Sequence, residues 1–315
     1  MKGLLTFLPG WQWFGRKEGG GANSARYCYS VWLRHRVIMA RCGFTPHPDT
    51  VAELGPGDSI GTGLAAILSG SKVYLAFDIV PFTALAKNLK IFDELVELFR
   101  KRTPIPDDTE FPDIYPHLDR YDFPAQLLPN NRLDKSLAEY RVHAIREILL
   151  KGKPQKKGIA DIRYVAPWNS NDVVEANSVD MIFSQAVMEH VDDLQTAYEK
   201  MHQWLKPGGI ISHEIDFRCH GTAKHWNGHW TYPDPVWRII RGCRPYFLNR
   251  QTCGRHLNLI RQAGFDIHQT TRQTRTQSIR KIDLCKRLDT ITDDDLVTSS
   301  AHILALKKGT ILGKR

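Results

Sequence analysis

A glycine turn between a short strand and a helix constrains the fold of this chain more than any other feature of its sequence. Residues Thr50 to Leu54 form a short, mostly apolar run, and Gly55-Pro56-Gly57 follows it directly. Apolar residues at helical spacing begin at Leu64. Glycines are needed where the backbone turns sharply and where a ligand presses against it. The pattern predicts a buried strand, a ligand-binding turn and a helix in succession.

An acidic residue ends the next predicted strand. Lys72 to Phe77 has the composition of a strand, and Asp78 closes it 21 residues after Gly57. A carboxylate at this place can accept hydrogen bonds from both hydroxyls of a ribose. A nicotinamide-binding domain uses similar geometry, but its third glycine would fall at Ile60. The residues therefore favour a cofactor that has a ribose but no pyrophosphate.

The rest of the chain alternates between predicted strands and predicted helices. Further strands are expected at 159–166, 179–183, 210–215, 265–271 and 302–307, and helices at 25–42, 82–102, 133–150, 193–205 and 251–263. This alternation predicts an α/β protein with a doubly wound, mostly parallel sheet and right-handed crossovers. We expect an N-terminal cap segment at 1–48 and one domain at 49–315, interrupted by a proline-rich insertion at about 103–132 and a lid at about 216–250.

Composition narrows the class of protein. Of the 315 residues, 42% are hydrophobic and 24% charged, which is ordinary for a globular protein. The net charge of +9 is spread over short clusters without the aromatic and basic interleaving of a nucleic-acid module. The six cysteines form no C-x-x-C pair, so neither a disulfide framework nor a zinc site is expected. No run is long enough for a transmembrane segment, and no secretory leader is evident, so we expect a cytoplasmic protein. The aromatic stretch from Leu4 to Phe14 could contact a membrane surface or a partner.

Four motifs occur in an order that resembles the class I S-adenosylmethionine (SAM)-dependent methyltransferases. They are Glu53-Leu54-Gly55-Pro56-Gly57, the acid Asp78, the segment from Ser178 to Val191, and Trp204-Leu205-Lys206-Pro207-Gly208-Gly209. The resemblance covers roughly residues 51 to 215. It implies SAM as the cofactor and a seven-stranded sheet, whose last strand at 302–307 runs antiparallel beside the fifth.

The resemblance also assigns roles to residues by position. It implies that Gly55 and Gly57 lie against the amino-acid part of SAM, that Glu53 reaches its ammonium group, that Asp78 binds its ribose, and that Ser184 and Gln185 border the methyl-transfer site. These relatives usually have an acid for the adenine amine shortly before a proline-aromatic pair. Here Ile162 stands at that place before Pro167-Trp168. Asp161 in a shifted register, or a backbone group, are the alternatives.

A narrower resemblance concerns residues 212–230. This segment looks like a subgroup of methyltransferases associated with bacterial polysaccharide and glycan biosynthesis, which implies O-methylation of a sugar hydroxyl. The segment is dense in residues that could stack on a sugar or bind its hydroxyls. The candidate acceptor-binding residues are His225, Trp226, His229 and Trp230.

His213 and Asp216 are the candidate catalytic residues. His213 falls near the carboxyl end of a predicted strand, where open α/β sheets bind ligands, and an imidazole there could take the acceptor proton. A hydrogen-bonded structural histidine is the alternative. Asp216 could orient that imidazole, accept a substrate hydroxyl or cap the lid. Together with His220, His225 and His229 these residues could hold a metal, but their spacing is not that of a defined site, so no metal is predicted.

Two other functions remain open at this point. One is a methyltransferase for a small aromatic or natural-product acceptor. The other is a catalytically silent SAM-binding subunit, which the intact glycines and Asp78 disfavour. Methylation of nucleic acid is disfavoured because Ser184-Gln185-Ala186-Val187 stands where those enzymes carry an Asn/Asp-Pro-Pro-aromatic tetrapeptide.

Overall fold

The computed structural model describes residues 2–7, 21–81, 83–152, 158–168, 174–244, 246–276, 279–288 and 290–309. The chain forms two compact units, which are described separately below. Unit 1 consists of 1–17, 186–202 and 213–305, and unit 2 of 18–185, 203–212 and 306–315. Most of the aromatic stretch from Leu4 to Phe14 lies outside the described residues.

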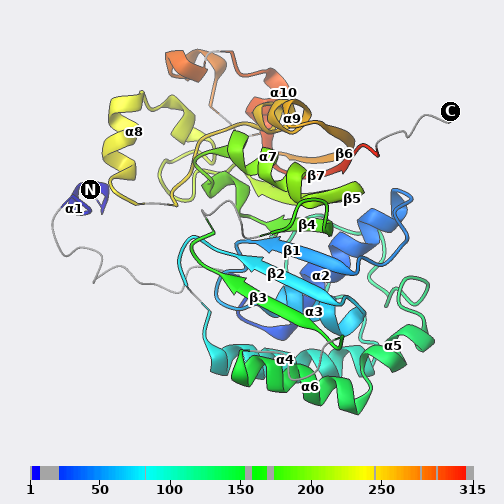
Figure 1. The fold of residues 1–315 in the computed structure, drawn as a ribbon. Coiled ribbons are helices and arrows are strands. Elements are labelled where there is room, and N and C mark those ends of the chain that lie inside the picture. The colour runs from blue at the N-terminus through cyan, green and yellow to red at the C-terminus, as the bar shows by residue number, and fades with distance from the viewer. Residues whose placement is uncertain are drawn as a thin grey trace. The chain divides into compact units, whose positions relative to one another are not determined.

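The strands form one seven-stranded sheet in the order β3-β2-β1-β4-β5-β7-β6 (Figure 1). They are β1 (Thr50–Leu54), β2 (Val73–Phe77), β3 (Asp161–Val165), β4 (Val179–Gln185), β5 (Leu205–Asp216), β6 (Phe265–Thr274) and β7 (Thr298–Lys307). β1 runs parallel to β2 and β4, and β2 runs parallel to β3. The predicted fold class, a doubly wound and mostly parallel α/β sheet, is confirmed.

The seventh strand runs against the others. The amide of Phe217, just after β5, donates to the carbonyl of Ser299 near the start of β7. At the other end, the Lys307 ammonium at the end of β7 donates to the carbonyl of Leu205 at the start of β5, 2.8 Å away. The start of one strand therefore lies beside the end of the other, which is the antiparallel arrangement that the resemblance implied.

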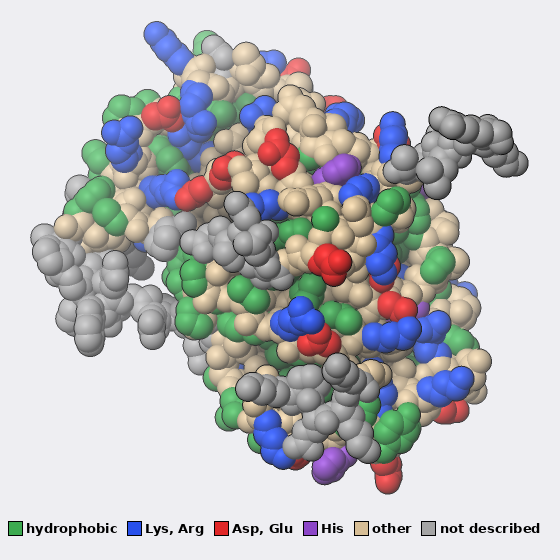
Figure 2. Space-filling model, viewed as in Figure 1, with side chains coloured by type: hydrophobic (Ala, Val, Ile, Leu, Met, Phe, Trp, Pro, Cys, Tyr) green, Lys and Arg blue, Asp and Glu red, His purple; other side chains and the backbone are tan. Residues whose placement is uncertain are grey.

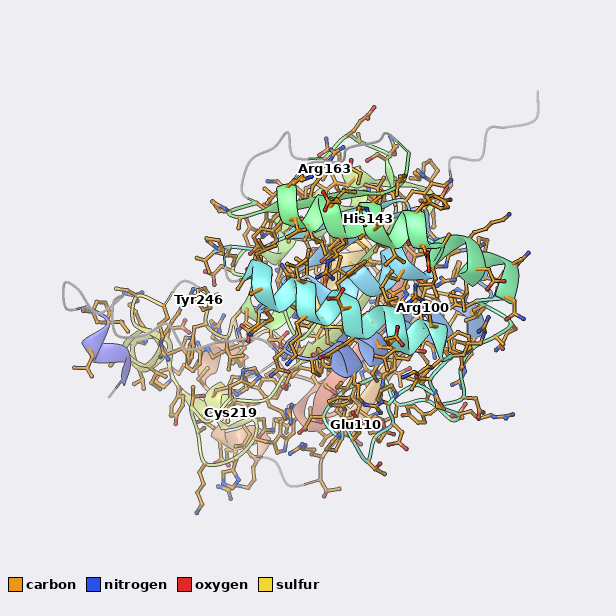
Figure 3. All side chains as sticks on the ribbon, turned by 90° about the horizontal axis from the view of Figure 1, so that it is seen from below. Arg100, Glu110, His143, Arg163, Cys219 and Tyr246 are labelled. Atoms are coloured by element: carbon orange, nitrogen blue, oxygen red, sulfur yellow. The ribbon has the colours of Figure 1, made fainter. Side chains whose placement is uncertain are left out.

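Unit 2 holds the central strands and their helices. Its helices are α2 (Ala25–Arg41), α3 (Gly61–Ser69), α4 (Leu85–Arg100), α5 (Asn130–Ser136) and α6 (Glu139–Lys151). α3 is buried along its whole length because it packs on β1 and β2 and is covered by α2 and α4. α4 and α6 lie side by side, as the positions of Arg100 and His143 show in Figure 3. Strands with mostly buried, mostly apolar side chains, such as β1 and β2, are typical of a parallel sheet covered on both faces.

The proline-rich insertion at 103–129 has no helix or strand, as its prolines predicted. One buried side chain holds it together. The Arg34 guanidinium on α2 is fully buried and donates to the carbonyls of Pro106, Ile114 and Pro116. A second contact joins Arg26 to Glu110, which Figure 3 labels. The insertion is therefore anchored on α2 and has little independent structure.

Unit 1 contains the start of the chain, most of α7 and the C-terminal helices. The elements are α1 (Lys2–Leu5), the 3-10 turns η2 (Met188–His190) and η3 (Gly228–Thr231), α7 (Leu194–Trp204), α8 (Asp234–Arg241), α9 (Cys253–Gln262) and α10 (Asp293–Val297), with the 3-10 turns η4 (Lys281–Asp283) and η5 (Lys286–Leu288) before α10. The predicted irregular lid at 216–250 thus contains a helix. α8 begins after Pro233 and has Pro235 in its first turn, where proline fits a helix rather than breaking it.

Two further boundaries differ from the sequence-based expectation. The helix expected at 133–150 is two helices, because Ala138 has extended backbone geometry (ψ 137°) between α5 and α6. The segment Lys206 to Gly209, expected as the turn before a strand, is part of β5. Gly208 has a positive φ of 81° there, which glycine adopts without strain.

No helix among the described residues is long and apolar enough to cross a membrane. On the face drawn in Figure 2, lysine and arginine side chains are scattered among acidic ones. This face has no single basic patch of the kind that binds nucleic acid.

Candidate functional site

The predicted glycine turn lies at the carboxyl ends of β1 and β2 in unit 2. Gly55 and Gly57 have positive φ values of 63° and 72°, which only glycine adopts readily. The Gly55 amide donates to the carbonyl of Phe77, 2.8 Å away, so the turn is held against the end of β2. This is the edge of an open α/β sheet at which ligands bind.

Asp78 follows directly on β2 and faces this turn. Its Oδ1 atom accepts from the amide of Ile79 at 2.8 Å. Its Oδ2 atom is buried and has no partner with hydrogen-bond geometry among the described residues. Burial raises the pKa of this carboxyl, although the nearby amides of Ile79 and Gly57 oppose the shift. A buried acceptor without a donor fits a ribose hydroxyl as its partner.

Glu53, the acid before the turn, points toward the first turn of α3. The Tyr74 hydroxyl donates to its Oε2 atom, and the Gly63 amide and Thr62 also stabilise the carboxylate. Burial outweighs these contacts and raises the pKa of Glu53 from 4.5 to about 8. These contacts join β1, β2 and α3 around the glycine turn. Contact between Glu53 and the ammonium of SAM stays a prediction.

We expect Glu53→Gln to make stability less dependent on pH. The folded pKa of about 8 lies above the ordinary 4.5, so the folded state keeps a proton that the unfolded state loses. Stability is then greatest below pH 4.5 and falls as pH rises to 8, by up to about 1.4 kcal/mol per pH unit. Chemical denaturation at pH 5 and pH 8 should show wild type losing at least about 1 kcal/mol more than Glu53→Gln. The exposed Glu97→Gln serves as control, and equal losses in all three proteins would contradict the assignment.

Ser184 and Gln185 end β4, and Ser184 pairs in register with Leu54 at the end of β1. The resemblance thus placed both residues at the edge that carries the glycine turn. The Gln185 amide donates to the carbonyl of Tyr115 at 3.0 Å, and its Oε1 lies 3.2 Å from Nε2 of His35. Since Oε1 can only accept, Nε2 of His35 carries the proton.

His35 is a site residue that sequence reasoning missed. Burial lowers the pKa of this imidazole to about 4, so it is neutral near pH 7, with Nε2 protonated and Nδ1 an acceptor. The hydroxyl of Ser212, 2.7 Å from Nδ1, is then the donor. A directed chain of hydrogen bonds from Ser212 through His35 to Gln185 fixes the end of β4. In the sequence, only the helical spacing of the apolar residues around His35 gave a signal, and that signal predicts a helix and not a role for His35.

The proline-aromatic pair that relatives carry near the adenine lies next to Asp78. The amide of Trp168 donates to the carbonyl of Asp78 at 3.2 Å, and the Trp168 ring is 6.4 Å from that of Phe77. Asp161 instead begins β3, at the opposite end of the strand, and binds Nε of Arg163 at 2.9 Å. Asp161 is therefore poorly placed as the adenine-binding acid, which leaves the backbone near Trp168 as the better alternative.

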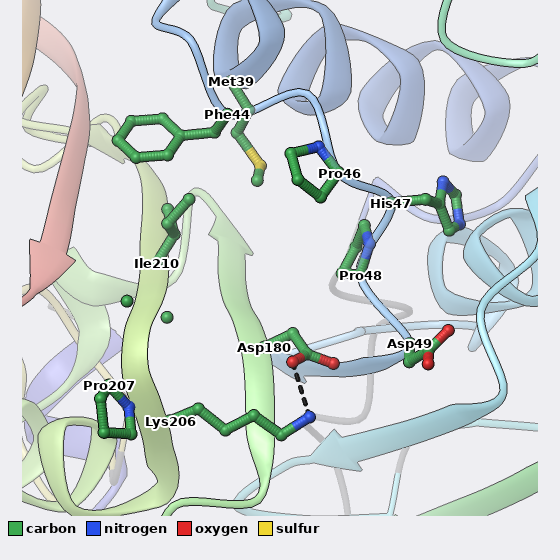
Figure 4. A pocket seen from close by; sticks show the side chains of 12 residues that line it. Met39, Phe44, Pro46, His47, Pro48, Asp49, Asp180, Lys206, Pro207 and Ile210 are labelled. Carbon is green, nitrogen blue, oxygen red and sulfur yellow. Dashed lines mark hydrogen bonds and ion pairs between the residues drawn. The ribbon is translucent and has the colours of Figure 1, made fainter. Parts of the chain in front are cut away.

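A different cavity lies at the amino ends of β1 and β4. Its volume is about 270 Å³, and Figure 4 shows Lys206 and Asp180 in its wall, joined by an ion pair of 2.7 Å. The other oxygen of Asp180 accepts from the amide of Thr50 at 2.8 Å. These two motif residues therefore tie β5 to β4 and β1 at the edge opposite the glycine turn, which is a structural role.

Asp216, at the end of β5 in unit 1, has two partners. Its Oδ2 atom lies 2.7 Å from the Arg218 guanidinium and 3.1 Å from Nε2 of His220. Burial would raise the pKa of Asp216, but the hydrogen bonds from His220 and Arg218 outweigh it and hold the pKa well below its ordinary value. Asp216 is thus ionised at neutral pH and orients the ring of His220.

The structure corrects the expected pairing of Asp216 with His213. Successive residues of a strand point to opposite faces, so His213 and Asp216 do not share a face of β5. His213 is fully buried, and its ring lies 6.1 Å from that of Tyr198 on α7. This placement favours the structural alternative for His213, while Asp216 acts on His220.

The four acceptor candidates divide into two pairs. His225 and Trp226 line a groove of about 490 Å³ together with Lys224, Thr274, Arg275 and Thr276. His229 and Trp230 are buried beneath, with ring centroids 5.1 Å apart. The expectation that Trp230 offers a stacking face is therefore wrong, because its side chain in η3 is fully buried. No group of metal-ligating side chains with suitable geometry occurs in the described ranges.

Comparisons with known proteins give one family match and several similar structures. Residues 150–212 match the model of a family described as a methyltransferase domain. No curated protein matches the sequence significantly. Similar solved structures include a putative sarcosine dimethylglycine methyltransferase from Galdieria sulphuraria (14% identity, 89% of this chain and 86% of that chain, TM-score 0.45). Others are a SAM-dependent methyltransferase from Mesorhizobium loti (12%, 85% and 96%, 0.41) and phosphoethanolamine N-methyltransferase 2 from Haemonchus contortus in complex with SAM (14%, 88% and 53%, 0.41).

The seven-stranded sheet, the glycine turn with Asp78 and the matched segment define a class I methyltransferase fold. The segment 150–212 is similar to a methyltransferase domain, and S-adenosylmethionine is the cofactor of the class to which this fold belongs. The buried Oδ2 of Asp78 is suited to accept a hydrogen bond from a ribose hydroxyl. Contact of Gly55 and Gly57 with the amino-acid part of the cofactor stays a prediction.

Proposed function

We propose that this enzyme methylates a hydroxyl of a saccharide that carries an anionic group, in glycan or polysaccharide biosynthesis. The groove around Trp226 carries the proposal. It offers an aromatic ring, the hydroxyls of Thr274 and Thr276, and the cations Lys224 and Arg275, and none of the described residues in its lining is acidic. Aromatic faces stack on the apolar C–H faces of sugars, and guanidinium groups bind phosphate or carboxylate.

The proton of the acceptor hydroxyl needs a base. Bound SAM supplies a sulfonium methyl group, so the protein has to orient the acceptor, exclude water and accept one proton. His220 is the best-placed base in unit 1, because ionised Asp216 holds its Nε2 and would stabilise the imidazolium. Its side chain is 33% exposed, so an acceptor can reach it.

We expect Trp226→Ala to raise the KM for saccharide acceptors about three- to tenfold, because stacking on an aromatic ring contributes about 0.5–1.5 kcal/mol. Trp226→Phe keeps an aromatic face and should remain near wild type. Arg275→Ala should weaken only anionic acceptors, with the exposed Arg261→Ala as its matched control. Labelled SAM with a panel of nucleotide sugars, glycan fragments and phenols measures all four.

Two results of this panel would replace the proposal. Transfer to phenols alone would establish the small aromatic acceptor, for which the same Trp226 surface is suited. SAM binding without turnover on any acceptor would favour the silent partner subunit. Saccharide transfer that is indifferent to Trp226 and Arg275 would remove the groove from the argument.

A further inference from the structure

Glu189 is a buried carboxyl group in unit 1 that accepts no hydrogen bond from the described residues. It lies in η2, directly after β4, and is 3% exposed. The amides of Glu189 and Asp216 are near enough to stabilise a charge on it, yet neither carboxyl oxygen has a partner with hydrogen-bond geometry within the described part of the chain. A buried polar group left in this state costs about 1–3 kcal/mol. Such a cost is typical of a group that serves a ligand.

The backbone around Glu189 is held firmly. The side-chain amide of Asn249 donates to the carbonyls of Met188 and Val191 at 2.8 and 2.9 Å. The backbone amide of Asn249 donates to the carbonyl of Glu189 itself at 2.8 Å. Ala186, with a positive φ of 53°, is tied to the carbonyl of Glu214. These hydrogen bonds fix the backbone of the turn that carries the carboxyl group of Glu189.

The surroundings of Glu189 are acidic. Burial, and after it the charges of Glu214 and Asp216, raise the pKa of Glu189 well above its ordinary value. Burial also raises the pKa of Glu214 to about 8. Arg218 is a nearby cation, and it makes three hydrogen bonds to Asp216 through its side chain. The charge of Arg218 also acts on Glu214.

The imidazole of His190 does not provide a positive charge next to Glu189. Nε2 of His190 lies 4.0 Å from Oε1 of Glu189, but burial and the neighbouring His220 lower the pKa of His190 to about 4, so this ring is neutral at pH 7. The rings of His190 and His220 are 5.4 Å apart. Their side chains are 29% and 33% exposed, so they connect the buried carboxyl to solvent. Figure 3 labels Cys219, the residue between Arg218 and His220, and so locates this cluster.

We propose that Glu189 binds a protonated amino group of the acceptor, so that the acceptor is an amino sugar. This proposal rests on the saccharide function proposed above and adds a charged group that the acceptor must carry. The amine need not be the atom that is methylated, since His220 beside it can serve a hydroxyl of the same ring. The basic groove and the acidic cluster would then bind groups of opposite charge on one substrate.

A cation fits this cluster better than a hydroxyl. A hydroxyl would satisfy one oxygen of Glu189 but would not stabilise its ionised form. An ammonium group donates up to three hydrogen bonds and interacts favourably with Glu189, Glu214 and Asp216 at once. Burial and the neighbouring carboxyl groups favour the protonated form of Glu189, whereas a bound ammonium group favours the ionised form. A proton that leaves Glu189 on binding passes to solvent, and a carboxylate-ammonium pair remains.

The test compares glucosamine with glucose as probes. Calorimetry on the full chain saturated with S-adenosylhomocysteine measures the affinity for each, and two buffers of different ionisation enthalpy measure the protons released. We expect wild type to bind glucosamine at least tenfold more tightly than glucose and to release a proton. Glu189→Gln keeps the shape and the hydrogen bonds of a neutral carboxyl but cannot ionise, so it should lose both the preference and the proton release. The exposed Glu199→Gln on α7 is the matched control and should keep both.

Equal affinity for the two sugars, no detectable binding of glucosamine, or a preference that survives in Glu189→Gln would overturn the proposal. Failure of this proposal can be told from failure of the function. Methyl transfer to neutral sugars, unaffected by Glu189→Gln, would remove the amine site and leave the saccharide function in place. Glucosamine binding that depends on Glu189, without methylation of any saccharide, would do the reverse.

Discussion

His220→Asn should lower turnover by about 10²–10⁴-fold while SAM affinity stays near wild type. The range is that of a single general base, and His220 is the imidazole that an ionised carboxylate, Asp216, holds in position. Asparagine is the appropriate replacement because His220 has a positive φ of 46°, which asparagine tolerates better than alanine. Single-turnover rates with labelled SAM, with cofactor affinity measured separately, distinguish a chemical defect from a binding defect.

The same assay decides between His220 and His213. His220→Asn should lower the single-turnover rate, because the chemical step loses its base. His213→Asn should change folding stability more than this rate, since His213 is fully buried against α7. If His220→Asn turns over like wild type and His213→Asn does not, the original expectation for His213 is restored.

Asp78→Ala should weaken SAM binding about 10- to 150-fold. A charged acceptor that is lost from a buried site leaves ribose donors unpaired, at a cost of about 1.5–3 kcal/mol. Calorimetric titration of SAM measures the change. The SAM affinity of Asp78→Asn, which keeps one acceptor oxygen, should lie between those of wild type and Asp78→Ala.

Asp180→Asn is the control for this experiment, because Asp180 sits on the same sheet at the amino end of β4, where it pairs with Lys206. It should bind SAM like wild type. Unchanged affinity in a folded Asp78→Ala protein would show that the carboxylate does not serve the ribose.

Periodicity and turn residues were sufficient to predict most of the sheet. β1 was placed to the residue, and β2, β3 and β4 to within one or two residues at most ends, because apolar runs between helices and glycine turns are local signals. The break between α5 and α6 and the helix α8 were missed. Both depend on packing against other segments, and proline is ambiguous, since it breaks the interior of a helix but suits its first turn.

The candidate site was predicted only where a motif marked it. Asp78 and the two glycines were found from their spacing, and the structure gives Asp78 an unpartnered oxygen at the predicted place. His35 and Glu189 gave no comparable signal, since their importance comes from neighbours far away in the sequence. Contacts between residues far apart in the sequence produce no periodic pattern by which they could be predicted. Of the three roles that the sequence left open for Asp216, orientation of His213 does not fit, because residues three apart on a strand point to opposite faces.

The neighbours Arg34 and His35 have a consequence for any attempt to trim this enzyme. Adjacent residues of α2 serve two different parts of unit 2, since Arg34 holds the carbonyls of the proline-rich insertion and His35 holds Gln185 at the end of β4. The insertion in turn supplies the Tyr115 carbonyl that receives the Gln185 amide. The helix α2, the insertion and the end of β4 therefore each contact the other two segments. A shortened enzyme that begins at residue 49 would lose the contacts of α2, and one with a shorter proline-rich insertion would lose the Tyr115 carbonyl. Either change would remove support from the end of β4. The cap segment and the insertion are therefore structural parts of unit 2.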